Sequence, residues 1–69
     1  MKKIINKIEK RINELEERNT ESRAFCRLLD ENNKEDKKIL DDELNMRKMR
    51  IFATLELKDL IEEIKAESN

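Results

Sequence analysis

The heptapeptide DENNKED, Asp30–Asp36, is a polar run and the one convincing boundary in the chain. Asn32 or Asn33, followed by Glu35 and Asp36, has the pattern of a helix N-cap with acidic residues in the first helical turn. On either side, apolar residues recur at helical spacing. We therefore predict a single domain over residues 1–69, with one helix at about 2–31, a turn at about 31–34 and a second helix at about 34–67.

Composition supports an all-α fold. The 69 residues include no Gly, Pro, His, Trp or Tyr, and 48% of them are charged. Without the two residues that most often form tight turns, strand hairpins are disfavoured, and abundant Glu, Lys, Arg, Leu and Ile is typical of long helices and coiled coils.

The charge balance argues against a large electrostatic attraction to nucleic acid or membrane, since the chain has 16 basic and 17 acidic residues and a net charge of −1. No segment has the apolar length of a signal peptide or a membrane span.

Cys26 is the single cysteine, which excludes an intrachain disulfide and suits a reducing compartment. We expect a cytoplasmic protein that does not enter a membrane and, because the chain starts at Met1, a complete small reading frame.

The first predicted helix carries one heptad stripe, with spacings of three and four residues. Its members are Ile5, Ile8, Ile12, Leu15, Asn19, Ser22, Cys26 and Leu29. Whether this helix is broken near Asn19–Thr20, where either residue could cap a new helix, is left open by the sequence.

Folding the chain back at Asn32–Asn33 predicts an antiparallel, coiled-coil-like hairpin. This register sets Ile12 near Ala53 and Leu15 near Met49. The second helix would therefore meet the first through a face formed by Ile39, Met46, Met49, Ala53, Leu57 and Leu60.

A second apolar face remains uncovered in that hairpin. Its residues are Phe25, Leu28, Leu40, Leu44, Ile51, Phe52 and Leu55. Because each buried Leu, Ile or Phe contributes roughly 1.5–3 kcal/mol, and because a lone hairpin buries little surface, we expect this face to be covered. Two alternatives stay open: a homodimer that closes a four-helix bundle, or docking of a different protein.

Residues for catalysis are scarce. With no His and one Cys, neither a catalytic triad nor an ordinary zinc site can form, and without Gly there is no phosphate-binding loop. The carboxylates of LDDEL and IEEIKAE are interpreted as solvated faces, and Cys26 as a buried small hydrophobe. We expect no enzyme activity, no catalytic or metal-binding residue, no cofactor and no small-molecule substrate.

The motif LDDELN, Leu40–Asn45, invites one comparison. Small helical-hairpin phosphatases of sporulation response regulators carry the signature Ser-Gln-Glu-Leu-Asp, whose matching positions here run from Asp41 to Asn45. Only Glu43 and Leu44 are shared, and Asn45 replaces the final carboxylate. The chain is not assigned to that family.

Arg47, Lys48 and Arg50 form a small basic cluster that could bind nucleic acid or an acidic partner. The plasmid copy-number RNA-binding protein is similar in shape, as a dimeric helical hairpin, although no sequence match supports the likeness.

The favoured function is a non-enzymatic regulator or inhibitor that binds another protein through its helix faces, as a phage or prophage factor directed at a host protein would. The alternatives are a dimeric RNA-binding hairpin and a structural assembly protein.

Overall fold

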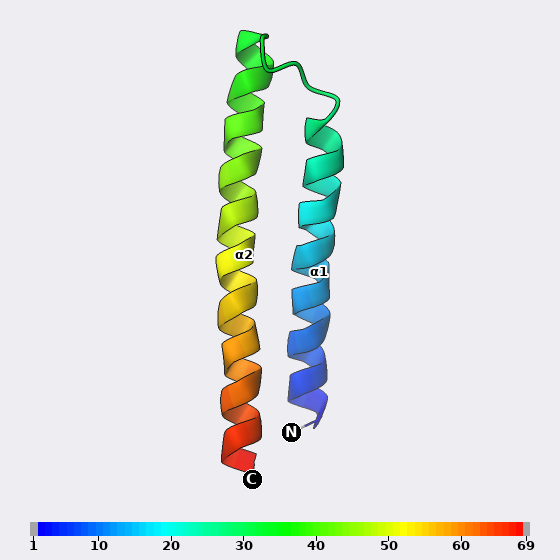
Figure 1. The fold of residues 1–69 in the computed structure, drawn as a ribbon. Helices are drawn as coiled ribbons and strands as arrows, with labels where there is room; N and C mark the ends of the chain where they lie inside the picture. The colour runs from blue at the N-terminus through cyan, green and yellow to red at the C-terminus, as the bar shows by residue number, and fades with distance from the viewer. Residues whose placement is uncertain (1, 69) are drawn as a thin grey trace.

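The chain folds into two helices that lie side by side and run in opposite directions (Figure 1). This computed structural model describes residues 2–68, the last of them by its backbone alone. Helix α1 spans Lys2–Cys26 and helix α2 spans Lys34–Ser68. The prediction of an all-α helical hairpin is confirmed.

The hairpin is a rod of 54 × 14 × 10 Å, with a radius of gyration of 16.0 Å. A compact domain of this length would have a radius of gyration of about 11 Å. The 35 residues of α2 exceed the 25 of α1, and Figure 1 shows the first turn of α2 rising beyond the end of α1. The outer surface of α2 is therefore large relative to the contact that α1 provides.

The connector between the helices, residues 27–33, is longer than the predicted turn, because α1 ends at Cys26 and not near residue 31. Beyond that point, backbone bonds from Leu28 to Phe25 (3.0 Å) and from Leu29 to Cys26 (3.2 Å) close tighter turns. Such three-residue turns commonly end α-helices. Asp30 then accepts the Asn32 N–H on its Oδ1 (2.9 Å), which holds the chain in a turn.

The start of α2 agrees with the N-cap prediction. Asn33 Oδ1 accepts the backbone N–H groups of Glu35 (3.0 Å) and Asp36 (3.1 Å), two of the donors that a helix leaves unpaired at its N-terminus. Asp36 Oδ2 in turn accepts the N–H of Asp30 (3.0 Å), which ties the connector to the first turn of α2.

Helix α1 is continuous across Asn19–Thr20. Thr20 does not cap a new helix there. Its hydroxyl donates to the carbonyl oxygen of Glu16 one turn earlier (3.2 Å), so the side chain bonds within the helix that it occupies.

The predicted stripe of α1 is confirmed. Its central members are buried and its end members are half-buried: Ile5, Ile8, Ile12, Leu15, Asn19, Ser22, Cys26 and Leu29.

The predicted contact face of α2 is wrong. Met49 is 70% exposed, and Ile39, Met46 and Leu60 are exposed as well, although Ala53 and Leu57 are half-buried. Helix α2 is rotated so that Thr54 and Ile61 are its buried residues. Its half-buried residues also lie mainly between the two apolar sides of the helix: Leu40, Glu43, Arg47, Arg50, Leu57 and Ile64.

Candidate interaction site

The half of the helix contact nearest the connector is a polar network. Arg47 Nη1 donates to Ser22 Oγ (3.0 Å) and to Cys26 Sγ (3.2 Å). Ser22 Oγ donates to Glu43 Oε2 (3.0 Å). The cation, the hydroxyl and the carboxylate therefore form one chain of hydrogen bonds across the two helices.

Asn19 extends this network by one turn. Its Nδ2 donates to the carbonyl oxygen of Arg47 (3.3 Å), and its Oδ1 accepts from Arg50 Nη1 (3.2 Å). Within residues 2–67, every buried side-chain nitrogen and oxygen has a hydrogen-bond partner.

The network explains the rotation of α2. Asn19 and Ser22 are 5% and 7% exposed, and burying such groups without partners costs free energy. Methionine side chains facing them could not donate or accept strong hydrogen bonds. Turning α2 so that Glu43, Arg47 and Arg50 meet α1 supplies the missing partners.

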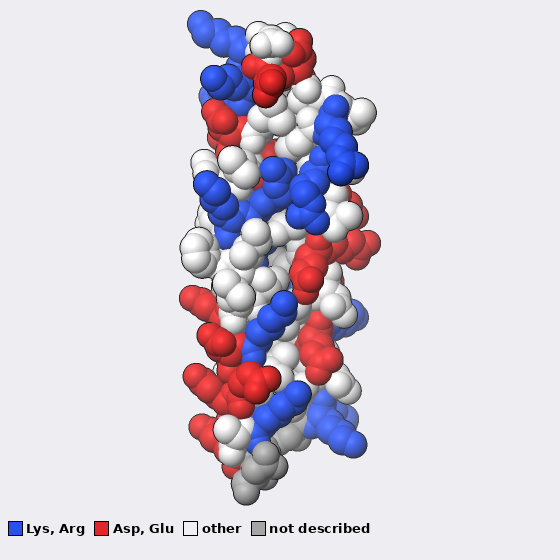
Figure 2. Space-filling view, viewed as in Figure 1, with Lys and Arg blue, Asp and Glu red and all other residues white. Residues whose placement is uncertain are grey.

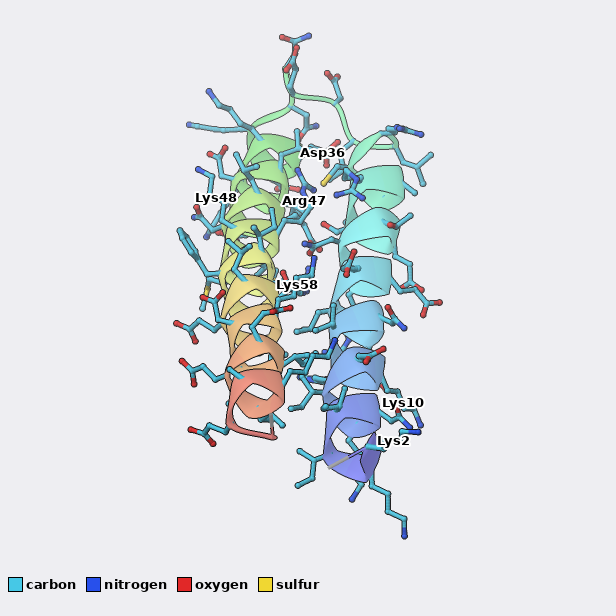
Figure 3. The ribbon with its side chains drawn as sticks, turned by 60° about the horizontal axis from the view of Figure 1, so that its bottom comes forward. Lys2, Lys10, Asp36, Arg47, Lys48 and Lys58 are labelled. Carbon is cyan, nitrogen blue, oxygen red and sulfur yellow. The ribbon has the colours of Figure 1, made fainter. Side chains whose placement is uncertain are left out.

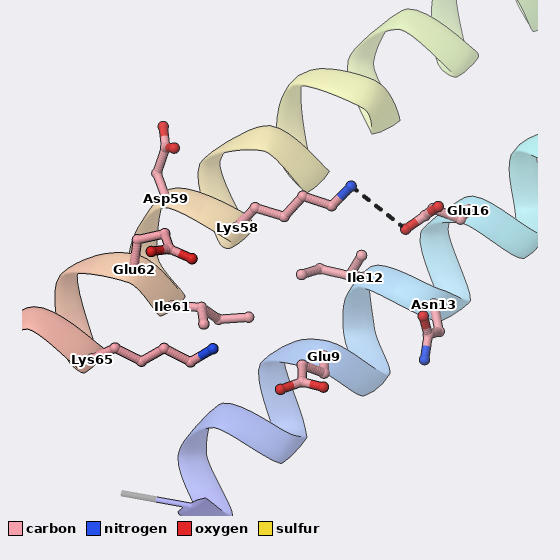
Figure 4. Close-up of a pocket in the computed structure, with 9 residues that line it drawn as sticks. All are labelled: Glu9, Ile12, Asn13, Glu16, Lys58, Asp59, Ile61, Glu62 and Lys65. Carbon is pink, nitrogen blue, oxygen red and sulfur yellow. Dashed lines mark ion pairs between the residues drawn. The ribbon is translucent and has the colours of Figure 1, made fainter.

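The half of the contact nearest the chain termini is apolar at its centre, where Ile12, Leu15 and Ile61 are buried. A shallow hollow beside it has Ile12 and Ile61 in its lining and charged side chains around them (Figure 4). Lys58 Nζ lies 4.0 Å from Glu16 Oε1 in this hollow, and both side chains are 56% exposed. An ion pair so long and so exposed contributes little to stability.

Helix α2 carries exposed apolar side chains on both sides of its contact with α1. Leu44, Ile51 and Leu55 lie on one side, where Ile51 lines a hollow together with Thr20 and Lys58. We call this side the Ile51 flank.

The other side of α2, which we call the Met flank, carries Ile39, Met46, Met49, Ala53 and Leu60. Ala53 and Leu60 line a separate hollow with Arg11 and Leu15 of α1.

The seven residues predicted to form one uncovered face are divided by the structure. Leu44, Ile51 and Leu55 do share the Ile51 flank, and Phe52, 68% exposed, lies further round α2. Phe25 lines a hollow with Glu43 and Arg50, away from Ile51. Leu28 lies in the connector and is 82% exposed, and Leu40 is half-buried and not uncovered.

The predicted basic cluster is divided too. Arg47 and Arg50 are half-buried and donate to residues of α1, whereas Lys48 is exposed. Figure 3 shows Arg47 pointing between the helices and Lys48 pointing outwards, away from α1. The three side chains do not form one cationic surface.

Sequence reasoning missed Glu43, Thr54 and Ile61 as contact residues of α2. A signal was present: Asn19 and Ser22 on the stripe of α1 require polar partners, and Glu43, Arg47 and Arg50 stand at helical spacing to provide them. Cys26 was expected to be a buried hydrophobe, but it is half-buried and accepts a hydrogen bond from Arg47.

No cluster of three or more Cys, Asp or Glu side chains suited to a metal ion occurs within the described part of the chain. Neither α1 nor α2, over residues 2–68, has an apolar stretch long enough to span a membrane.

Comparison of the chain with protein-family models, curated proteins and solved structures finds no match.

Proposed function

We propose that this chain is a non-enzymatic regulator or inhibitor that binds other proteins through α2. In this proposal two copies associate into a four-helix bundle through one flank of α2, and the other flank binds the target protein.

The observation that supports the proposal is the distribution of exposed apolar side chains on α2. They lie on both sides of the contact with α1: Ile39, Leu44, Met46, Met49, Ile51, Phe52, Leu55 and Leu60. A helix that is apolar on several sides is normally surrounded by other helices. Since covering each large side chain contributes roughly 1.5–3 kcal/mol, α2 gains substantially from further partners.

Charge distinguishes the two flanks. On the Met flank, helical spacing interleaves the apolar residues with Asp42, Glu56 and Glu63, all exposed. A second copy of this face of α2 therefore offers these carboxylates no basic side chain. A target helix with apolar residues bordered by Lys or Arg fits it better, because it combines apolar contact with opposite charge. Methionine side chains adapt readily to such a surface.

The test is affinity capture from the cell that encodes the protein, using the tagged full chain after nuclease treatment. The variant Met46→Lys/Met49→Lys removes apolar area and adds repulsion towards a basic partner. The matched control Asn6→Lys/Ala24→Lys adds the same charge at exposed positions on the outer side of α1. We expect the wild type and the control to capture one protein at fixed stoichiometry and the Met-flank variant to lose it.

Three outcomes would contradict the proposal. Equal capture by all three baits would show that the Met flank is not used, and loss of capture after nuclease would favour the RNA-binding alternative. Assemblies that grow with protein concentration and exclude other proteins would favour a structural role.

A further inference from the structure

Eight exposed residues follow one strict heptad stripe along the Ile51 flank of α2. They are Lys37, Asp41, Leu44, Lys48, Ile51, Leu55, Lys58 and Glu62. Their spacing alternates between four and three residues, as in a coiled-coil contact. We call this set the Lys48 stripe. It stands roughly a quarter of a turn around α2 from the residues that meet α1.

The order of residues along the Lys48 stripe is self-complementary in one orientation only. From its N-terminal end inwards, the stripe carries a cation, an anion and a leucine (Lys37, Asp41 and Leu44). From its C-terminal end inwards, it carries an anion, a cation and a leucine (Glu62, Lys58 and Leu55). An antiparallel copy of the stripe therefore places unlike charges opposite each other and leucine opposite leucine. The opposed pairs are Lys37 with Glu62, Asp41 with Lys58, Leu44 with Leu55, and Lys48 with Ile51.

From this complementarity we infer that the Ile51 flank binds a second copy of the same chain, with the two α2 helices antiparallel about a two-fold axis between Lys48 and Ile51. The inference rests on the dimer included in the proposed function and specifies its surface, direction and register. A two-fold dimer repeats every pair, so each favourable contact counts twice. Lys48 covers Ile51 of the second copy with its aliphatic stem and keeps its ammonium in water.

Charged residues of α1 also form an unlike pair about the same two-fold axis. Asn19 is level with the centre of the stripe, because it bonds to Arg47 and Arg50 of α2. Glu16 and Arg23 lie on either side of that level and line the same hollow as Ile51. The two-fold axis that pairs the α2 helices therefore brings Glu16 towards Arg23 of the second copy, again with unlike charges.

The distribution of charge over this face of the molecule also favours an antiparallel arrangement (Figure 2). Figure 2 shows basic side chains gathered in the half of the rod towards the connector, and acidic ones prominent along α2 in the other half. Reversing one copy against another brings these regions together. A parallel arrangement would place each residue of the stripe beside its own equivalent and would oppose like charges.

The Met flank does not offer this arrangement to a second copy. The charges that α2 contributes there are acidic (Asp42, Glu56 and Glu63), and the basic side chain beside them, Arg11, belongs to α1. Neither direction of pairing two α2 helices through this flank therefore gives unlike charges between them. The Lys48 stripe is therefore the surface of α2 that a second copy fits.

The first test is the solution mass by light scattering. The wild type is expected at about twice 8.4 kDa. Ile51→Glu/Leu55→Glu is expected to be monomeric, whereas the matched control Met46→Glu/Met49→Glu stays dimeric. A monomeric wild type would overturn both this inference and the dimer of the proposed function. A dimer that survives changes to the Ile51 flank but is split by the Met-flank change would overturn this inference alone.

Disulfide trapping tests the direction and leaves the apolar residues of both flanks of α2 unchanged. In a Cys26→Ala background, Asp41→Cys and Lys58→Cys are prepared as separate chains, both at exposed positions. Each chain alone is expected to form little disulfide-linked dimer under mild oxidation, and a mixture of the two is expected to form it readily. Linked dimers from either chain alone would show a parallel arrangement and overturn the inference, as would a mixture that does not link.

A charge swap tests the register. Lys37→Glu or Glu62→Lys alone should weaken the dimer by roughly tenfold at low salt, because each change sets like charges opposite each other twice in the dimer. The double variant should restore the wild-type dissociation constant. Equal weakening in the double variant would contradict the proposed pairing.

Discussion

The two halves of the helix contact are built differently. Towards the chain termini, Ile12, Leu15 and Ile61 are buried against apolar neighbours. Towards the connector, Asn19, Ser22 and Arg47 are joined by hydrogen bonds of 3.0–3.3 Å. Apolar burial favours association but tolerates sliding and rotation, since it is non-directional. The polar half accepts one arrangement, because each donor needs its acceptor. We infer that the apolar half supplies most of the stability and that the polar half specifies the rotation of α2.

The largest expected effect comes from breaking the apolar half. Leu15→Ala leaves a cavity between the helices and should lower the free energy of unfolding by about 2–5 kcal/mol. For a small domain that is enough to leave much of the protein unfolded. The measurement is urea denaturation followed by circular dichroism at one fixed protein concentration. Leu28→Ala is the control, because Leu28 is 82% exposed, and equal losses in both variants would contradict the burial difference.

Disrupting the polar half should lower the free energy of unfolding by less than Leu15→Ala does. Arg47→Ala removes the donor to Ser22 and Cys26 and leaves Glu43 without the adjacent cation, for an expected loss of about 1–3 kcal/mol in the same denaturation experiment. Lys38→Ala, an exposed lysine of the same helix, should change stability little. An Arg47→Ala loss as small as that of the control would show that the network contributes nothing.

Replacing the whole polar network by apolar side chains should separate its effect on stability from its effect on the rotation of α2. In Asn19→Leu/Ser22→Ala/Glu43→Leu/Arg47→Leu/Arg50→Leu, the donors and acceptors of the network disappear together, so we expect stability equal to or above that of the wild type. The rotation of α2 should then be less well determined. The measurement is disulfide trapping with one cysteine on α1 and one at each of several alternative positions on α2. We expect more than one position on α2 to link, and linking at a single position would contradict the role of the network in fixing the rotation.

A smaller loss is expected at the connector. Asn33→Ala removes the acceptor for the N–H groups of Glu35 and Asp36 and should cost about 1 kcal/mol. Asn32→Ala is a close control, because the bond of Asn32 to Asp30 uses its backbone N–H. The unfolding midpoint should fall for Asn33→Ala and stay close to the wild-type value for Asn32→Ala. Equal midpoints for the two variants would contradict the capping role of Asn33.

The smallest effect is expected at the ion pair of Glu16 and Lys58. Glu16→Gln should change the free energy of unfolding by less than about 0.5 kcal/mol, because both side chains are largely in water and 4.0 Å apart. A larger loss, particularly one that disappears at high salt, would assign this pair a structural role.

The stripe of α1 was predictable from the sequence because charged residues border it on both sides. One orientation alone buries Ile12 and Leu15 without burying a charge, so periodicity decides which face turns inwards. The N-cap at Asn33 was predictable for a similar local reason. An amide side chain directly before acidic residues satisfies backbone donors, whatever the rest of the chain does.

The contact face of α2 was not predictable in the same way. Met46 and Met49 offer one apolar side and Ile51 and Leu55 another, so burial by itself does not choose between them. The end of α1 was missed for a related reason. Leu28 and Leu29 continue an apolar pattern, but the connector at Asp30 and Asn32 has its own hydrogen bonds and stops the helix earlier.

Local sequence pattern is sufficient to make this protein helical, to reverse the chain near Asn33 and to turn the Ile12 and Leu15 stripe of α1 towards its neighbour. Those properties follow from local bonding and from a single apolar face. The side of α2 that turns towards α1 depends instead on contacts between the two helices. Asn19 and Ser22 need hydrogen-bond partners once they are buried, and the guanidinium groups of Arg50 and Arg47 donate to them where methionine side chains could not.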